Sequence, residues 1–153
     1  MTVQTLNSSE LFYEANIQFT DTVDYGVSME ALTSGKLAVP LGGARFDQTF
    51  QGVLQGPRLN GTIVGTDYLY VRADGRFQLH LHGRVTTEDG INISLSSEGV
   101  SIQIEGEKEA QIRSAVSLFS SSETYQWLNQ LQLWDVGTLD PVKGEAFIRA
   151  FAS

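Results

Sequence analysis

The chain has 153 residues, with 18 acidic side chains against 10 basic ones and a formal net charge of −8. This length fits one domain over residues 1–153, and the acidity opposes binding to a phosphate backbone. The absence of cysteine excludes disulfides and thiolate nucleophiles. No apolar stretch reaches the length of a membrane span. We therefore expect a cytoplasmic protein without nucleic-acid or membrane partners, and a homo-oligomer remains open.

The first half of the chain alternates apolar and polar residues in short segments. Residues 11–20 and 50–54 have the period of strands. Residues 27–38 also favour a strand, although Met29, Glu30, Ala31 and Leu32 would tolerate a short helix. The proline and paired glycines of residues 39–43 predict a loop.

The second half predicts consecutive antiparallel strands. Residues 62–71 and 76–86 form a hairpin around Asp74-Gly75, because this dipeptide supplies the positive φ of a tight turn. The only helix expected in this half is a short one over residues 107–113. Further strands are expected at 91–95, 100–105, 115–120, 127–134 and 146–151.

About nine short strands with short connections predict an all-β domain. Such a chain forms a sandwich or a closed barrel, and closure leaves no unpaired strand edge. We expect a single antiparallel β-barrel with at most one short helix.

Several ordered motifs resemble one known family, the domain-of-unknown-function 3237 family. They are Gly56-Pro57-Arg58-Leu59 with Gly61, Asp67, Arg72-x-Asp74-Gly75, Asp89-Gly90, and Tyr125-x-Trp127-Leu128-Asn129. The resemblance implies a small barrel similar to calycin or allene-oxide-cyclase-like barrels, with an interior of ligand size. Similar barrels resemble cofactor-free cyclases or isomerases. The chain departs from the family pattern at His80 and His82, where relatives often have an acidic residue or an arginine.

His80 and His82 are the only histidines of the chain, and strand periodicity places them on one face with Arg76 and Arg84. This face either lines a polar interior, where the histidines are candidate catalytic groups, or forms a solvated outer face. A His-x-His pair also suggests a metal site. Since no third histidine exists and Glu88 comes too late in the sequence, we expect no metal.

Tyr125, Trp127 and Asn129 share a face of the expected strand at 127–134 and are candidate substrate-binding residues. Trp127 would form an aromatic wall and Asn129 would be a neutral donor. The alternative is that Trp127 belongs to the core and Asn129 pairs with backbone.

Acid–base catalysis needs a carboxyl group in an apolar pocket, where desolvation raises its pKa. Asp67 and Glu30 are the candidates, and Asp67 is alternatively a turn residue. Tyr70 and Arg72 are further candidates for substrate binding, since arginine suits a carboxylate or another delocalised anion.

The chain has no nucleophile elbow, P-loop or dinucleotide fingerprint, so no cofactor is expected. The leading hypothesis is a cofactor-independent barrel enzyme. It would act on a hydrophobic, aromatic or phenolic small molecule by isomerisation, cyclisation or addition to a double bond. The alternatives are a non-catalytic carrier with the same pocket and a structural protein with a solid core.

Overall fold

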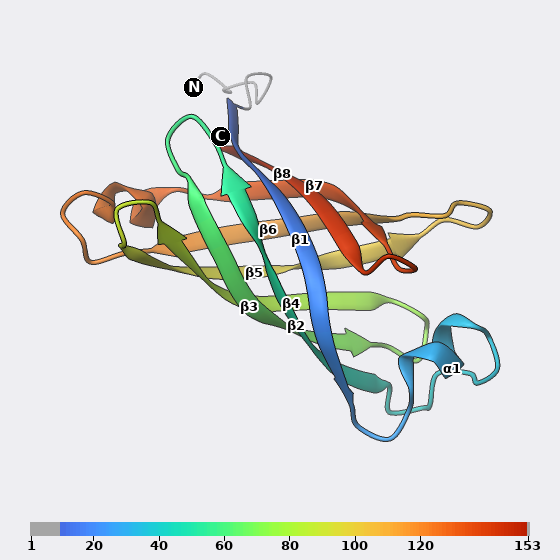
Figure 1. Cartoon of the computed structure of the whole chain (residues 1–153). Helices are drawn as coiled ribbons and strands as arrows, with labels where there is room; N and C mark the ends of the chain where they lie inside the picture. Colours follow the sequence, from blue (N-terminus) through green and yellow to red (C-terminus); the bar gives the residue numbers. More distant parts are fainter. Residues whose placement is uncertain (1–9, 153) are drawn as a thin grey trace, which may run out of the picture.

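The computed structural model describes residues 10–152, which form a closed barrel of eight antiparallel strands in chain order (Figure 1). The last strand closes on the first, with Glu10 opposite Ala152 and Gln18 opposite Glu145. The strands are β1 (Glu10–Asp24), β2 (Ala44–Gln55), β3 (Gly61–Val71), β4 (Phe77–Thr87), β5 (Asn92–Gln103), β6 (Ala110–Phe119), β7 (Leu133–Asp140) and β8 (Glu145–Ala152).

The predicted all-β barrel is confirmed, and it has eight strands because two expected strands are one and residues 27–38 contain no strand. Residues 91–95 and 100–105 fall largely in the continuous β5, which pairs with β4 from Asn92 to Ser101. Since closure pairs every strand on both sides, the barrel has no free edge.

Three local predictions were wrong. The expected strand at 27–38 contains the short helix α1 (Met29–Thr33), whose start is capped by the Ser28 hydroxyl accepting the N–H of Ala31. The expected helix at 107–113 is a turn followed by the start of β6. The expected strand at 127–134 is the 3₁₀-helix η1 (Gln126–Gln130), and β7 begins only at Leu133.

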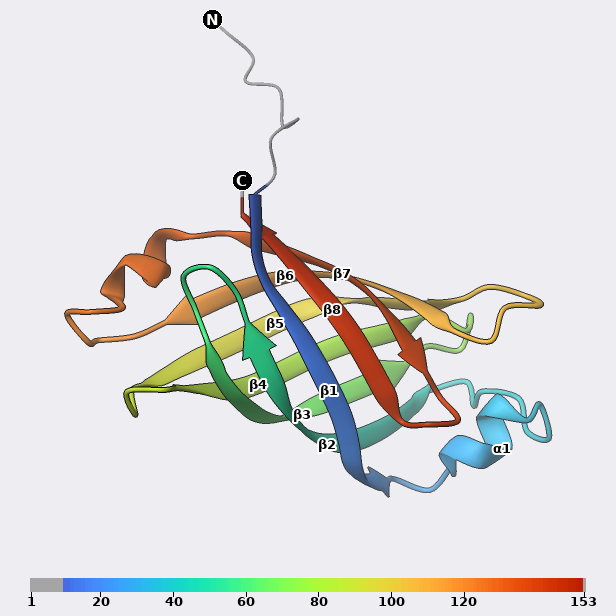
Figure 2. The ribbon, with the colours of Figure 1, turned by 45° about the horizontal axis from the view of Figure 1, so that its top comes forward.

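The two ends of the barrel differ. At the end that carries η1, side chains fill the interior solidly, and Phe12, Leu59, Leu128 and Leu133 are all buried in one core cluster. The opposite end carries α1 and the loop that follows it (Figure 2). Within residues 10–152 no helix is long and apolar enough to cross a membrane.

Glycines bring neighbouring strands close together on the inner face. A Cβ at Gly99 in β5 would collide with the carbonyl of Arg113 in β6, and a Cβ at Gly65 in β3 would collide with the carbonyl of His82 in β4. Such glycines allow strands to bend sharply, which a small closed barrel requires.

Candidate active site in the barrel lumen

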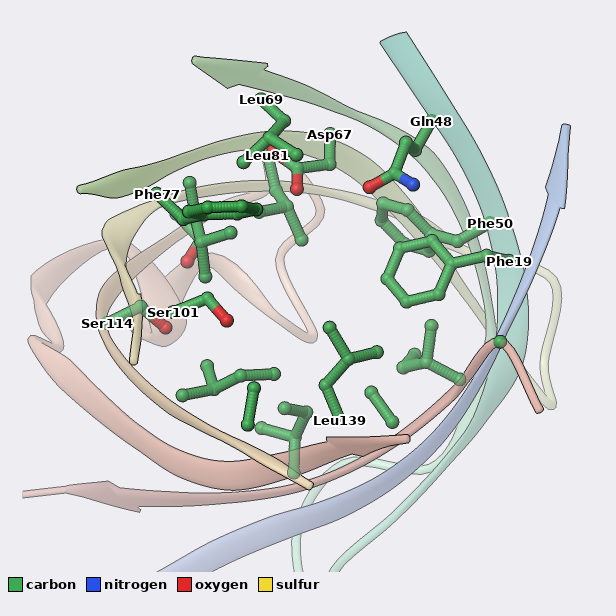
Figure 3. Close-up of a pocket in the computed structure, with 18 of the residues that line it drawn as sticks. Phe19, Gln48, Phe50, Asp67, Leu69, Phe77, Leu81, Ser101, Ser114 and Leu139 are labelled. Carbon is green, nitrogen blue, oxygen red and sulfur yellow. The ribbon is translucent and has the colours of Figure 1, made fainter. Parts of the chain in front are cut away.

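The barrel encloses a cavity of about 770 Å³ between the filled end and α1. Its walls are mainly aliphatic and aromatic, and Phe19, Phe50 and Phe77 supply three rings (Figure 3). The volume lies within the usual range of small-molecule sites. Met29 and Leu32 of α1 line the cavity at its other end.

Asp67 projects from β3 into this cavity and is only 2% exposed. It occupies an inward position of an otherwise apolar strand face, between Ile63 and Leu69, which are both buried. Burial raises the pKa of Asp67 from 3.8 to about 6, and the N–H and charge of His80 limit the rise. The group can therefore exchange a proton near neutral pH.

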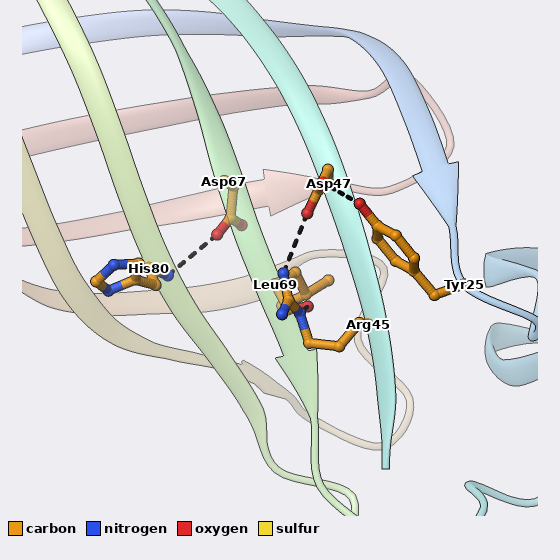
Figure 4. Close-up of polar contacts among 6 residues, drawn as sticks. All are labelled: Tyr25, Arg45, Asp47, Asp67, Leu69 and His80. Carbon is orange, nitrogen blue, oxygen red and sulfur yellow. Dashed lines mark hydrogen bonds and ion pairs between the residues drawn. The ribbon is translucent and has the colours of Figure 1, made fainter.

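The position of Asp67 coincides with a gap in the ladder between β3 and β4. Asp67 is paired with Leu81, and pairing resumes only at Tyr70 with Gln78. Within this gap the backbone N–H of His80 donates to Oδ1 of Asp67 at 3.1 Å (Figure 4). The carboxyl thus replaces a backbone acceptor and is held in a fixed orientation.

A second acid, Asp135, lines the cavity from β7. The hydroxyls of Tyr13 and Ser114 lie 3.5 Å from its Oδ1 and Oδ2, respectively. Burial raises the pKa of Asp135 from 3.8 to about 7, while the contacts with Ser114 and Tyr13 act in the opposite direction. Burial and the neighbouring carboxylate raise the pKa of Tyr13 well above 10, so this phenol stays protonated.

The two acids stand on opposite walls. β3 and β7 are four places apart in a closed barrel of eight strands, so the wall that carries Asp67 is opposite the wall that carries Asp135, and both acids line the cavity. The remaining polar lining includes Gln48, Ser97 and Ser101. The site therefore holds two titratable carboxyls in largely apolar surroundings, an arrangement suited to proton transfer.

The structure places His80 and His82 on the outside of the barrel, and neither lines the cavity. Their Nε2 atoms lie 3.1 Å apart, and Nδ1 of His80 lies 3.2 Å from the exposed Glu98. The reason is the register of β4, whose apolar residues Leu79 and Leu81 take the inner face. In residues 10–152 no three His, Asp or Glu side chains gather in a way that could hold a metal ion.

Glu30, Tyr70 and Arg72 also lie away from the cavity. Glu30 is exposed on α1. Tyr70 lines an open groove outside the barrel, and its hydroxyl donates to the carbonyl of Gly42. Arg72 pairs with Asp74 in the exposed turn between β3 and β4. One catalytic candidate and two substrate-binding candidates thus lie outside the cavity.

Tyr125, Trp127 and Asn129 lie at the filled end of the barrel, where they organise η1. The amide of Asn129 bonds to both the N–H and the carbonyl of Ser120, at 2.7 and 2.9 Å. The indole of Trp127 donates to the carbonyl of Thr124, and the hydroxyl of Tyr125 donates to Asp89. None of the three lines the cavity.

Sequence reasoning identified Asp67 and missed Asp135, Tyr13 and Ser114. A signal for Asp135 existed, because Leu133, Asp135, Gly137 and Leu139 alternate with outward residues, and an aspartate on such a face is unusual. The signal was lost because the expected strand ended at residue 134, just before Asp135, whereas β7 continues to Asp140.

Solved structures with the same fold come from bacteria and a fungus. A protein of unknown function from Clostridium acetobutylicum superposes with a TM-score of 0.80 over 99% of both chains, at 16% identity. A β-barrel-like protein from Acinetobacter baumannii gives 0.73 over 95% of this chain and 94% of that chain, at 18% identity. An enzyme from Penicillium herquei gives 0.66 over 99% and 98% of the two chains, at 23% identity. At these identities the likeness establishes the fold.

Two sequence comparisons are more specific. The hydroalkoxylation enzyme phnH of Penicillium herquei is 36% identical over 84 residues, which are 54% of this chain and 50% of that protein. The match thus spans about half the length of this relative. The family model described as "Protein of unknown function (DUF3237)" matches residues 10–142, which is most of the barrel. The chain therefore belongs to the DUF3237 family.

Proposed function

We propose that the protein is a barrel enzyme that adds a hydroxyl group across a carbon–carbon double bond of a small hydrophobic molecule in its lumen. The observation that carries this proposal is the pair of lumen carboxyls, the buried Asp67 and the half-buried Asp135, with raised pKa values on opposite walls of one cavity. The similarity to the hydroalkoxylation enzyme phnH supports the reaction type.

Both acids titrate close to neutral pH, so one can donate a proton while the other accepts one. We assign Asp135 as the proton donor, because its pKa is raised further, and Asp67 as the proton acceptor. Tyr13 and Ser114 hold the donor in place.

The reaction balances with these groups alone. Asp135 transfers its proton to one alkene carbon, and the π bond breaks. The substrate hydroxyl oxygen forms a bond to the other alkene carbon, and its proton passes to Asp67. Proton exchange with water then restores both acids. The addition is redox-neutral, and the cavity contributes by holding the hydroxyl close to the alkene.

The alternative is a carrier that uses the same apolar walls. Desolvation of two carboxyls is unfavourable when they ionise, and a carrier gains nothing from it. Catalysis gives both groups a role, so we favour the enzyme.

The test uses ortho-alkenyl phenols such as 2-(3-methylbut-2-enyl)phenol, whose internal addition gives cyclic ethers of unchanged mass. Chromatography with mass detection would follow the product. We expect Asp67→Asn and Asp135→Asn each to lower turnover by roughly 10²-fold or more while binding is retained. Asp21→Asn is the matched control, since this acid lines the cavity but is exposed. Wild-type turnover in both variants would contradict the proposal, and binding without conversion in the wild type would favour the carrier.

A further inference from the structure

Every charged side chain that lines the cavity is acidic. Asp21, Asp67 and Asp135 contribute carboxyls, and among residues 10–152 no lysine, arginine or histidine borders this space. The basic residues of the neighbouring strands point outward. Arg45, for example, pairs with Asp47 on the outer face of β2 (Figure 4). The intervening Phe46 is buried on the inner face, since side chains alternate along a strand.

The acidic lining of the cavity makes the binding of an anionic ligand unfavourable for two reasons. The anion would lose its hydration in an apolar cavity, and it would then lie beside carboxylates without any cation to compensate. An uncharged ligand suffers neither penalty. It also leaves Asp67 and Asp135 free to exchange protons.

Polar groups are scattered among the rings of the cavity wall. Ser97 and Ser101 of β5 and Ser114 of β6 face inward on adjacent strands. Ser101 and Ser114 lie across the cavity from Phe19 and Phe50, whereas Phe77 is the cross-strand partner of Ser101 (Figure 3). Hydroxyls bind oxygen substituents, whereas phenylalanine rings pack against an aromatic or alkenyl skeleton.

We propose that the cavity selects uncharged aromatic ligands with oxygen substituents and rejects carboxylates, sulfonates and phosphates. The proposal rests on the proposed function, because it names the substrate class of the same site. It keeps the expected aromatic or phenolic ligand and assigns no role to Arg72, which pairs with Asp74 in an exposed turn.

The experiment compares two dyes that share one skeleton. N-Phenyl-1-naphthylamine is neutral, whereas 8-anilino-1-naphthalenesulfonate carries one sulfonate. At pH 8 we expect the neutral dye to bind with increased fluorescence and the sulfonate to bind at least tenfold more weakly. 2-Naphthol and 2-naphthoate, compared by calorimetry at pH 7, form a second neutral and anionic pair.

Two variants connect this preference to the lumen. The double variant Asp67→Asn/Asp135→Asn should reduce the difference between each neutral probe and its anion severalfold, since it removes the opposing charge. Ala146→Phe places a ring in the cavity and should abolish binding of the neutral dye, with circular dichroism confirming the fold. Asp74→Asn removes an exposed acid and should change neither affinity.

Three results would overturn the proposal: equal affinity for the neutral and anionic probes, a difference that the double asparagine variant leaves unchanged, or failure of both neutral probes to bind. The measurements require no turnover. Failure of the proposed reaction with the neutral preference intact would therefore be distinguishable from failure of this proposal.

Discussion

Asp67, inside the barrel, accepts a hydrogen bond from the backbone N–H of His80, whose imidazole lies outside. The contact crosses the barrel wall through the main chain, at the gap in the β3–β4 ladder. The orientation of the carboxyl therefore depends on the backbone of residue 80 and not on its side chain.

Replacing either outer histidine should accordingly have little effect on catalysis. We expect His80→Gln and His82→Gln to keep turnover of the alkenyl phenols within about twofold of wild type, because the N–H of residue 80 remains. Steady-state rates at pH 8 would test this. A tenfold loss in either variant would place an imidazole in the reaction and contradict the assignment.

The stability of the protein should fall as the pH rises from 4 to 8. The folded pKa values of Asp67 and Asp135, about 6 and about 7, exceed the ordinary value of 3.8, so the folded state binds more protons than the unfolded state in this range. The stabilising contribution of the two protonated carboxyls is fully present below pH 4. It is lost as the pH rises through about 6 for Asp67 and about 7 for Asp135. The shifts correspond to about 3 kcal/mol for Asp67 and about 4 kcal/mol for Asp135.

Urea unfolding of wild type, Asp67→Asn and Asp135→Asn at pH 4 to 8 would measure this effect. In each variant the free energy of unfolding should depend less steeply on pH, because the replaced carboxyl no longer contributes. Asp74→Asn is the control: partial desolvation opposes the change, but the N–H of Arg76 and the contacts with Arg72 lower the pKa of Asp74 below its ordinary 3.8. Its contribution to stability is lost only as the pH falls below 4, so this variant should keep the wild-type slope between pH 4 and 8. A wild-type slope in Asp67→Asn would contradict the burial of this acid.

The basic limb of the pH–rate profile should depend on the partners of Asp135. The contacts with Ser114 and Tyr13 hold the pKa of Asp135 down against burial, with Ser114 having the larger effect. Ser114→Ala, and to a smaller extent Tyr13→Phe, should therefore move the loss of activity to higher pH, since Asp135 acts in its protonated form. The acidic limb near pH 6, which we assign to ionisation of Asp67, should keep its midpoint. Ser97→Ala is the control, and an equal shift there would contradict a specific role of Ser114.

Gly99→Ala should destabilise the barrel by about 1 to 3 kcal/mol, because the added methyl group would collide with the carbonyl of Arg113. Gly42→Ala is a matched control, since no atom lies within 4 Å of its ideal Cβ. Thermal or urea unfolding of both variants would compare them. Equal stability would mean that β5 and β6 can separate at this point without cost.

Alternation of apolar and polar residues, together with turn residues, was sufficient to predict an all-β barrel from the sequence. The Asp74-Gly75 turn and the apolar period of residues 62–71 predicted the hairpin of β3 and β4, because these signals act between residues close in the chain. Residues 27–38 and 127–134 were misassigned, since alternation over a few residues also suits a short helix. The Ser28 cap and the hydrogen bonds of Asn129 to the backbone of Ser120 form only in the folded chain.

The sequence by itself determined which residues share a face of each strand. On β4 it separated the histidines from Leu79 and Leu81, since side chains alternate strictly along a strand. Only the tertiary structure decided which face points inward, because this depends on closure of all eight strands. Closure also brought Asp67 and Asp135 to opposite walls of one cavity. The desolvation that raises their pKa values exists only after the whole barrel excludes water from both, so no local pattern could reveal the pair.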